Sequence, residues 1–145
     1  MKILKLSAQR HLLITWLIGT FALVVMIIFQ QSVGIFGDNS DDLWDWFIPN
    51  FFPTLTMMLG AYVAISRQIN IEKKMIDKFN YNLCLGGIIL YFLLILIVLF
   101  TMNLAIDANS KLTPIQHLHN YSKLISAIHG GVTLLLGMFF VQENS

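Results

Sequence analysis

The sequence predicts an all-α membrane protein in which four transmembrane helices form one antiparallel bundle, a single domain over residues 1–145. Two observations lead to this fold class. Of the 145 residues, 57% are hydrophobic and only 12% are charged, with a mean hydropathy of +0.72. So much apolar surface cannot be hidden in one soluble core of this size, so lipid must cover much of it. The apolar residues also fall into four runs of about the length of a bilayer crossing, and nearly all charged residues lie between them.

The first helix is predicted at about residues 11–30, which at about 1.5 Å per residue spans roughly 30 Å of hydrocarbon. The basic residues before it resemble the start of a signal peptide. The apolar run is longer than a signal peptide's core, and no small-residue cleavage site follows, so we expect a retained span. A stripe of small side chains around Thr15, Gly19 and Ala22 suits close helix packing.

The second helix is predicted at about residues 47–66. Trp44 and Trp46 stand just before it, and we expect their indoles to anchor the helix at the level of the lipid headgroups. Pro49 suits a first helical turn, whereas Pro53 either kinks the helix or belongs to a non-helical start. Polar and small residues then occupy two neighbouring faces of the helix: Asn50, Pro53, Thr54, Thr56 and Gly60.

The segment after the second helix is basic. Its cations are Arg67, Lys73, Lys74 and Lys78, which we expect to bind a soluble partner or lipid headgroups. Residues 70–79 have an amphipathic pattern at helical period, which predicts a helix on the membrane surface or an extension of the third span. The third span, at about residues 83–102, is bulky and apolar on all sides, so we expect it to face lipid.

The fourth helix is predicted to cross the membrane at about residues 121–141 and to extend outward from about residue 113. Thr113, Pro114 and Gln116 match a capping box with proline at the first helical position. His117 and His119 follow and are expected at the surface. Within the membrane, small and polar residues recur at spacings of three and four: Ser126, His129, Gly130, Thr133 and Gly137. We expect this face to pack against the second helix.

The distribution of lysine and arginine predicts the orientation. Seven of the nine lie on one side of the predicted membrane: Lys2, Lys5, Arg10, Arg67, Lys73, Lys74 and Lys78. That side is expected to be cytoplasmic. Both termini are then cytoplasmic, and the acidic loop at residues 38–45 faces outward.

His129 is the only titratable side chain expected well inside the membrane. A histidine there is a candidate proton relay, metal or haem ligand, or pore gate. The alternative is that a neutral imidazole hydrogen-bonds a neighbouring helix and only holds the bundle together. A b-type haem would need a second histidine at matching depth, and the only other one within a span is His11, at the cytoplasmic end of the first helix.

No sequence pattern indicates catalysis. The chain has no nucleophile–base pair, phosphate-binding glycine loop or zinc-ligand spacing, and its single cysteine, Cys84, excludes an internal disulfide. The aspartates at 38–42 alternate as calcium ligands do but lack the glycine and glutamate of a calcium loop. We therefore expect no enzyme, no catalytic residue, no metal and no cofactor. The expected partners are the lipid bilayer and other membrane chains, not nucleic acid.

The Pro-Asn-Phe-Phe-Pro-Thr-Leu element and the four-span layout resemble small membrane components of bacterial multi-gene systems, some of which are anti-phage effectors that permeabilise the inner membrane. This resemblance implies a bacterial inner-membrane protein. The leading hypothesis is an oligomeric pore or membrane-perturbing subunit lined by the second and fourth helices, since four helices alone enclose no channel. The alternatives are an anchor that docks a soluble partner on the basic face, and a haem- or proton-handling subunit acting through His129.

Overall fold

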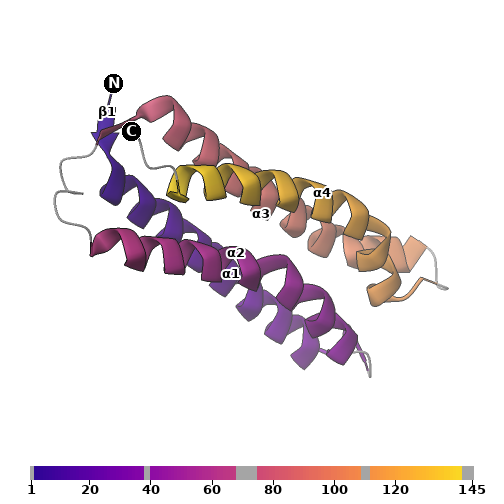
Figure 1. Cartoon of the computed structure of the whole chain (residues 1–145). Coiled ribbons are helices and arrows are strands. Elements are labelled where there is room, and N and C mark those ends of the chain that lie inside the picture. The colour runs from indigo at the N-terminus through magenta and orange to yellow at the C-terminus, as the bar shows by residue number, and fades with distance from the viewer. Residues whose placement is uncertain (1, 38–39, 68–74, 109–111, 142–145) are drawn as a thin grey trace.

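A computed structural model describes residues 2–37, 40–67, 75–108 and 112–141 of the chain. The elements, in chain order, are β1 (Lys2–Leu4), α1 (Lys5–Ser32), α2 (Ser40–Ser66), β2 (Met75–Asp77), α3 (Lys78–Ala108) and α4 (Pro114–Val141). Consecutive helices run in opposite directions and form an elongated bundle (Figure 1). All four helices are long and apolar enough to cross a membrane. The predicted all-α fold with four membrane-length helices is confirmed.

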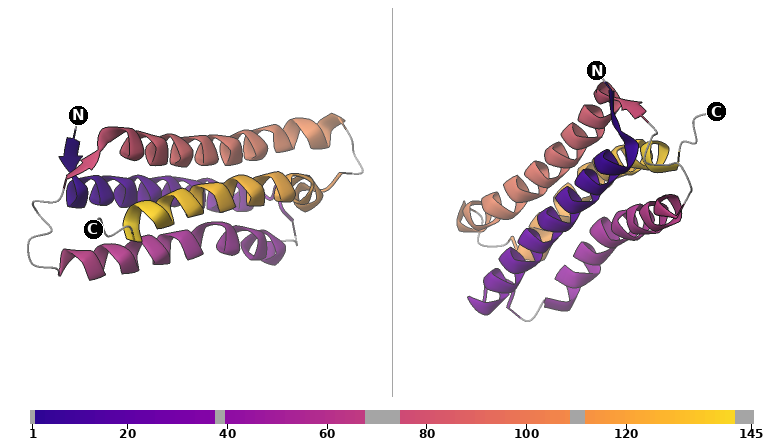
Figure 2. Two further views of the ribbon diagram at one scale, coloured as in Figure 1. Left: turned by 45° about the horizontal axis from the view of Figure 1, so that its top comes forward. Right: turned by 90° about the vertical axis from the view of Figure 1, so that its left-hand side faces the viewer.

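The helices occupy distinct positions in the bundle. Figure 2 shows α1 and α4 lying between α2 and α3, which are on opposite sides. The most extensive helix contact is that of α3 with α4, and α2 packs on both α1 and α4. The predicted packing of the second helix on the fourth is therefore confirmed.

Each predicted span lies inside a longer helix. α2 begins at Ser40 and not at about residue 47, so most of the predicted acidic loop at residues 38–45 is helical, and Asp41 and Asp42 lie in the first helical turn. Their negative charges interact favourably with the positive end of the helix dipole and so stabilise the helix start. α2 continues through Pro49 and Pro53. The non-helical start proposed as one alternative for Pro53 is therefore wrong, and so is the placement of Pro49 in the first turn, because the helix begins nine residues earlier.

The start of α4 is the one predicted. The backbone N–H of Thr113 donates to Gln116 Oε1 at 3.1 Å, and the N–H of Gln116 donates to Thr113 Oγ1 at 3.2 Å. These two bonds are the capping box, and Pro114 occupies the first helical position.

The prediction of an amphipathic helix over residues 70–79 is wrong for residues 75–77. These residues form β2, which pairs antiparallel with β1 in the register Lys2↔Asp77, Ile3↔Ile76 and Leu4↔Met75. The N-terminal strand supplies the backbone hydrogen bonds that helix formation would otherwise provide. The other residues of the predicted helix, apart from 78 and 79 at the start of α3, lie outside the described residues, as do Lys73 and Lys74.

The third helix, which was expected to face lipid, is covered by protein along one side. One face of α3 is buried, chiefly against α4, through Cys84, Ile88, Tyr91, Ile95 and Leu99. Its opposite face exposes Leu90, Leu93 and Phe100. A protein core and a lipid tail are both apolar, so the sequence of an apolar helix does not reveal which of its faces is covered by protein.

Close helix approach on α1 depends on a single glycine of the predicted small-residue stripe. A Cβ placed on Gly19 would lie only 2.6 Å from Cζ of Phe92 on α3. The Phe92 ring thus lies directly against the α1 backbone. Thr15 bonds within its own helix instead, donating to the carbonyl of His11 at 2.9 Å.

Candidate functional site

The centre of the bundle holds a polar and aromatic cluster to which every helix contributes: Trp16 from α1, Thr54 from α2, Tyr91 from α3, and His129 and Thr133 from α4. We call this set the central cluster. Trp16, Thr54 and Tyr91 are fully buried.

A three-membered hydrogen-bond chain joins α2 to α4 in this cluster. Thr54 Oγ1 lies 2.8 Å from His129 Nε2 and 2.8 Å from Thr133 Oγ1. A hydroxyl both donates and accepts, so Thr54 satisfies both neighbours at once. Which tautomer His129 adopts decides the direction of the chain. Inside a membrane, such bonds hold helices together because no water competes for the polar groups.

Two aromatic rings, those of Trp16 and Tyr91, pack against the His129 imidazole. The Trp16 and Tyr91 rings are 5.6 Å apart and nearly parallel, with an interplanar angle of 5°. The Tyr91 and His129 rings are 5.3 Å apart at 28°. Stacking restricts the orientation of the imidazole and so directs its Nε2 toward Thr54.

Two side chains of the central cluster bind the backbone of α2 in the turn before Pro53. Pro53 has no N–H to donate to the carbonyl of Pro49, four residues earlier, so the helix lacks one backbone bond in this turn. Tyr91 donates its hydroxyl to the carbonyl of Asn50 at 2.8 Å, and Trp16 donates its indole N–H to the carbonyl of Phe51 at 3.4 Å. Side chains of α1 and α3 therefore bind the backbone of α2 beside Pro53.

The structure divides the predicted polar faces into an inner and an outer set. Thr54, His129 and Thr133 meet inside the bundle, and the Asn50 amide donates to the carbonyl of Trp46 at 2.6 Å. Gly137 faces α2, since a Cβ there would lie 3.7 Å from Met57 Sδ. The remaining predicted residues are exposed on the outside: Pro53, Thr56 and Gly60 on α2, with Ser126 and Gly130 on α4. The two faces are therefore not one continuous wall.

The two predicted interface tryptophans have different surroundings. Trp44 is half-buried and meets the Phe47 ring edge-on at 5.8 Å. Trp46 is buried, and its indole N–H donates to Ser122 Oγ on α4 at 3.2 Å. Trp46 thus contributes to the packing of α2 on α4 near the start of α2.

The histidines in the first turns of α4 also differ from each other. His117 was expected at the surface but is only 3% exposed, and its Nε2 lies 3.2 Å from the carbonyl of Val98 on α3. That expectation is wrong, because the first turns of α4 pack against α3, which covers the side chain of His117. His119 is exposed, as expected.

The surroundings of His129 do not favour a haem ligand. Its Nε2 is engaged by Thr54, and His11 is exposed at the start of α1. Among the described residues, no group of three or more His, Cys, Asp and Glu side chains is placed to hold a metal ion. A role of His129 in binding a cofactor or moving protons stays a hypothesis.

Sequence reasoning missed Trp16 and Tyr91. Both carried a signal, since each is a polar-tipped ring in an apolar span, where its N–H or O–H requires a partner. Of the four cations predicted to bind a partner or headgroups, Arg67 and Lys78 lie among the described residues and are exposed. Arg67 follows the last residue of α2 and Lys78 begins α3, and Figure 1 shows these two helix ends near the N-terminus.

No family model, curated protein or solved structure matches this chain.

Proposed function

We propose that this chain is a non-enzymatic membrane subunit that assembles with further copies of itself through the outer faces of α2 and α4, forming an oligomeric pore that permeabilises the membrane. Its place in a bacterial inner membrane is part of this proposal and rests on the resemblance to small bacterial membrane components. The cytoplasmic position of both termini is also proposed and rests on the distribution of lysine and arginine.

The observation that carries the proposal is a mismatch on α2. α2 has the lowest mean hydropathy of the four spans, 1.3 against 3.0 for α3. It nevertheless has the smallest fraction of its span buried against the rest of the protein, 17% against 39% for α3. α4 is second lowest in both respects, at 1.5 and 28%. The least apolar helices of a membrane protein are expected to be the best covered, because polar groups are costly in lipid. Contact with further protein would remove this mismatch.

The outer residues of α2 and α4 suit such a contact. Thr56, Gly60, Ser126 and Gly130 are exposed and small, and nothing lies within 4 Å of a Cβ placed on Gly60 or Gly130. A neighbouring helix can therefore approach both backbones closely. The inner hydroxyls and imidazole already satisfy one another, so an aqueous path must be lined by these outer residues, between copies.

Gly60→Leu tests the assembly without disturbing a single bundle. The added side chain enters open space, so the protomer should fold normally, while a copy packed on α2 would be pushed away. Gly86→Leu on α3 is the matched control, because Gly86 is also exposed and has nothing within 4 Å. We expect Gly60→Leu to lower the native mass of the detergent-solubilised complex and Gly86→Leu to preserve it. If the native mass of the solubilised wild-type protein corresponded to a single chain, the proposal would be refuted.

Flux through liposomes tests the pore itself. Reconstituted wild-type protein should release a small trapped ion or dye, Gly60→Leu should release it several-fold more slowly, and Gly86→Leu should match wild type. No leakage under any activating condition would refute pore formation, even if the oligomer were found.

A second candidate function is favoured by the basic end of the bundle. Lys2, Arg10, Arg67 and Lys78 are exposed there, which gives a surface for an acidic soluble partner. Charge reversal of Arg67 and Lys78 should then release proteins that co-purify with the wild type. Retention of all of them would exclude these two residues as the docking surface.

A further inference from the structure

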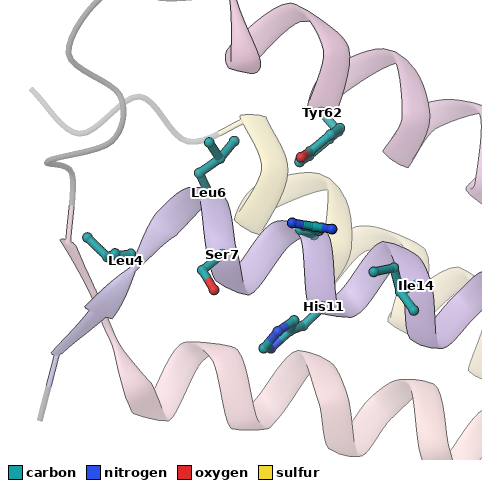
Figure 3. Close-up of a pocket in the computed structure, with 7 residues that line it drawn as sticks. Leu4, Leu6, Ser7, His11, Ile14 and Tyr62 are labelled. Atoms are coloured by element: carbon teal, nitrogen blue, oxygen red, sulfur yellow. The ribbon is translucent and has the colours of Figure 1, made fainter.

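An open groove of about 680 Å³ lies at the end of the bundle that carries the N-terminus. It is lined by Leu4, Leu6, Ser7, Arg10, His11 and Ile14, all from β1 and α1, and by Tyr62 from α2. Figure 3 shows Tyr62 reaching from α2 toward α1, and Ser7, His11 and Ile14 projecting from successive turns of α1. The groove thus combines one fixed cation with several hydrogen-bond donors and apolar walls.

The groove lies at headgroup depth if the helices cross a bilayer. α1 has 28 residues, about 42 Å, against roughly 30 Å of hydrocarbon, so about eight residues of α1 extend beyond the apolar layer. With the span at about residues 11–30, Arg10 and His11 stand at the boundary. Tyr62 is within about 8 Å of Arg67 along α2, a depth that tyrosine favours in membranes.

An apolar track continues from the groove along the outer face of α1. Ile14, Ile18, Phe21 and Val25 follow Arg10 at spacings of three and four, and all are exposed, Ile18 at 64% and Phe21 at 70%. Residues at these spacings lie on one side of a helix, and here they run from the boundary toward the membrane centre. An acyl chain lying along this track would cover them.

The charges near the groove select an anion. Lys2, Arg10, Arg67 and Lys78 are exposed at this end, and Asp77 is the only carboxylate there among the described residues. One Asp77 oxygen already accepts the backbone N–H of Phe79 at 3.2 Å. A guanidinium, the serine and tyrosine hydroxyls and an imidazole N–H are the donors that bind a phosphodiester.

We propose that this groove binds one anionic glycerophospholipid, with its phosphodiester held by Arg10, Ser7, His11 and Tyr62 and one acyl chain lying along Ile14, Ile18 and Phe21. The site uses a surface other than the outer residues of α2 and α4 on which assembly depends, so the two proposals can fail separately.

The test is native mass spectrometry of the full-length, delipidated protein titrated with dioleoyl phosphatidylglycerol, or with dioleoyl phosphatidylcholine, which has the same acyl chains and no net charge. We expect one phosphatidylglycerol per chain, bound about fivefold or more tightly than phosphatidylcholine, the factor that one nearby cation contributes at a membrane surface. Arg10→Gln should abolish this preference. Arg67→Gln is the matched control, since it removes an exposed arginine at the same end that does not line the groove, and it should keep the preference.

Two further arms decide what the site recognises. Glycerol 3-phosphate and inorganic phosphate lack acyl chains, and neither should displace phosphatidylglycerol at equal concentration. Displacement by either would overturn the lipid proposal in favour of a soluble-anion site. Equal binding of the two lipids, or equal losses in Arg10→Gln and Arg67→Gln, would also overturn it, because binding would then reflect only the apolar surface or the overall charge of this end. Far-UV circular dichroism checks that both variants stay helical.

Discussion

Replacing Thr54 by valine removes a single hydroxyl at nearly constant volume and should weaken the bundle measurably. That hydroxyl makes two contacts of 2.8 Å, to His129 Nε2 and to Thr133 Oγ1, at a site with 0% exposure. Hydrogen bonds between membrane helices contribute about 0.6 kcal/mol on average and about 1.7 kcal/mol at most. Losing two of them should lower the free energy of unfolding by about 1 to 3 kcal/mol.

Thr20→Val is a closely matched control. Thr20 is also buried, at 6% exposure, but its hydroxyl has no hydrogen-bond partner. The same chemical change there should be neutral or slightly stabilising, because an unsatisfied buried hydroxyl is replaced by a methyl group. The measurement is reversible unfolding in mixed micelles by titration with sodium dodecyl sulfate, followed by circular dichroism.

The comparison between the two variants decides the outcome. Equal free energies of unfolding for Thr54→Val and Thr20→Val would show that the Thr54 contacts add nothing to stability. A double-mutant cycle with Thr133→Val separates the contributions, since coupling between positions 54 and 133 measures their shared bond alone.

Three further predictions follow from other contacts. Tyr91→Phe should cost about 0.5 to 1.5 kcal/mol because the hydrogen bond from its hydroxyl to the carbonyl of Asn50 is lost, whereas Tyr121→Phe, at an exposed site, should cost nothing; the same unfolding titration measures both, and equal losses would contradict the first. Gly19→Ala should be less stable than Gly86→Ala by about 1 to 3 kcal/mol, since a Cβ at residue 19 would lie 2.6 Å from Phe92 and one at residue 86 meets nothing; a stable Gly19→Ala would show that the helices are farther apart. In a Cys84→Ala background, cysteines at Ile3 and Ile76 should form a disulfide under mild oxidation because they face each other in the β1–β2 ladder, seen as a change in mobility on a non-reducing gel; cysteines at Ile3 and Phe79 should not, and efficient bridging of that control pair would contradict the register.

The sequence predicted those features that have a local chemical signature. The capping box marked the start of α4 because its partners are three residues apart. The tryptophans and prolines indicated the second helix but not its start, since α2 begins at Ser40, before all four of them. The spacing of Thr133 and His129 on one helix face indicated a second polar surface. Packing these two helices together was expected because it brings the two polar surfaces into contact.

Features that depend on distant partners could not be predicted in this way. Tyr91 and Trp16 stand in apolar runs, where burial against protein and exposure to lipid produce the same composition. The strand pair has three residues on each side, too few for an alternating pattern, and its local sequence favours a helix. Nor did spacing separate Thr54, which faces inward, from Thr56, which faces outward, because both lay on faces judged polar.

The pairing of β1 with β2 also sets an order of events during synthesis. Leu4 is made before its strand partner Met75, which follows only after two whole helices. At about 5 to 20 residues per second, the interval is roughly 4 to 15 s. For that time the N-terminal strand has no partner, so the first helix pair must be held by its own contacts. When residues 75–77 emerge, the pairing fastens the chain's beginning to the start of α3. The strand pair therefore forms late and then holds the start of the third helix beside the start of the first.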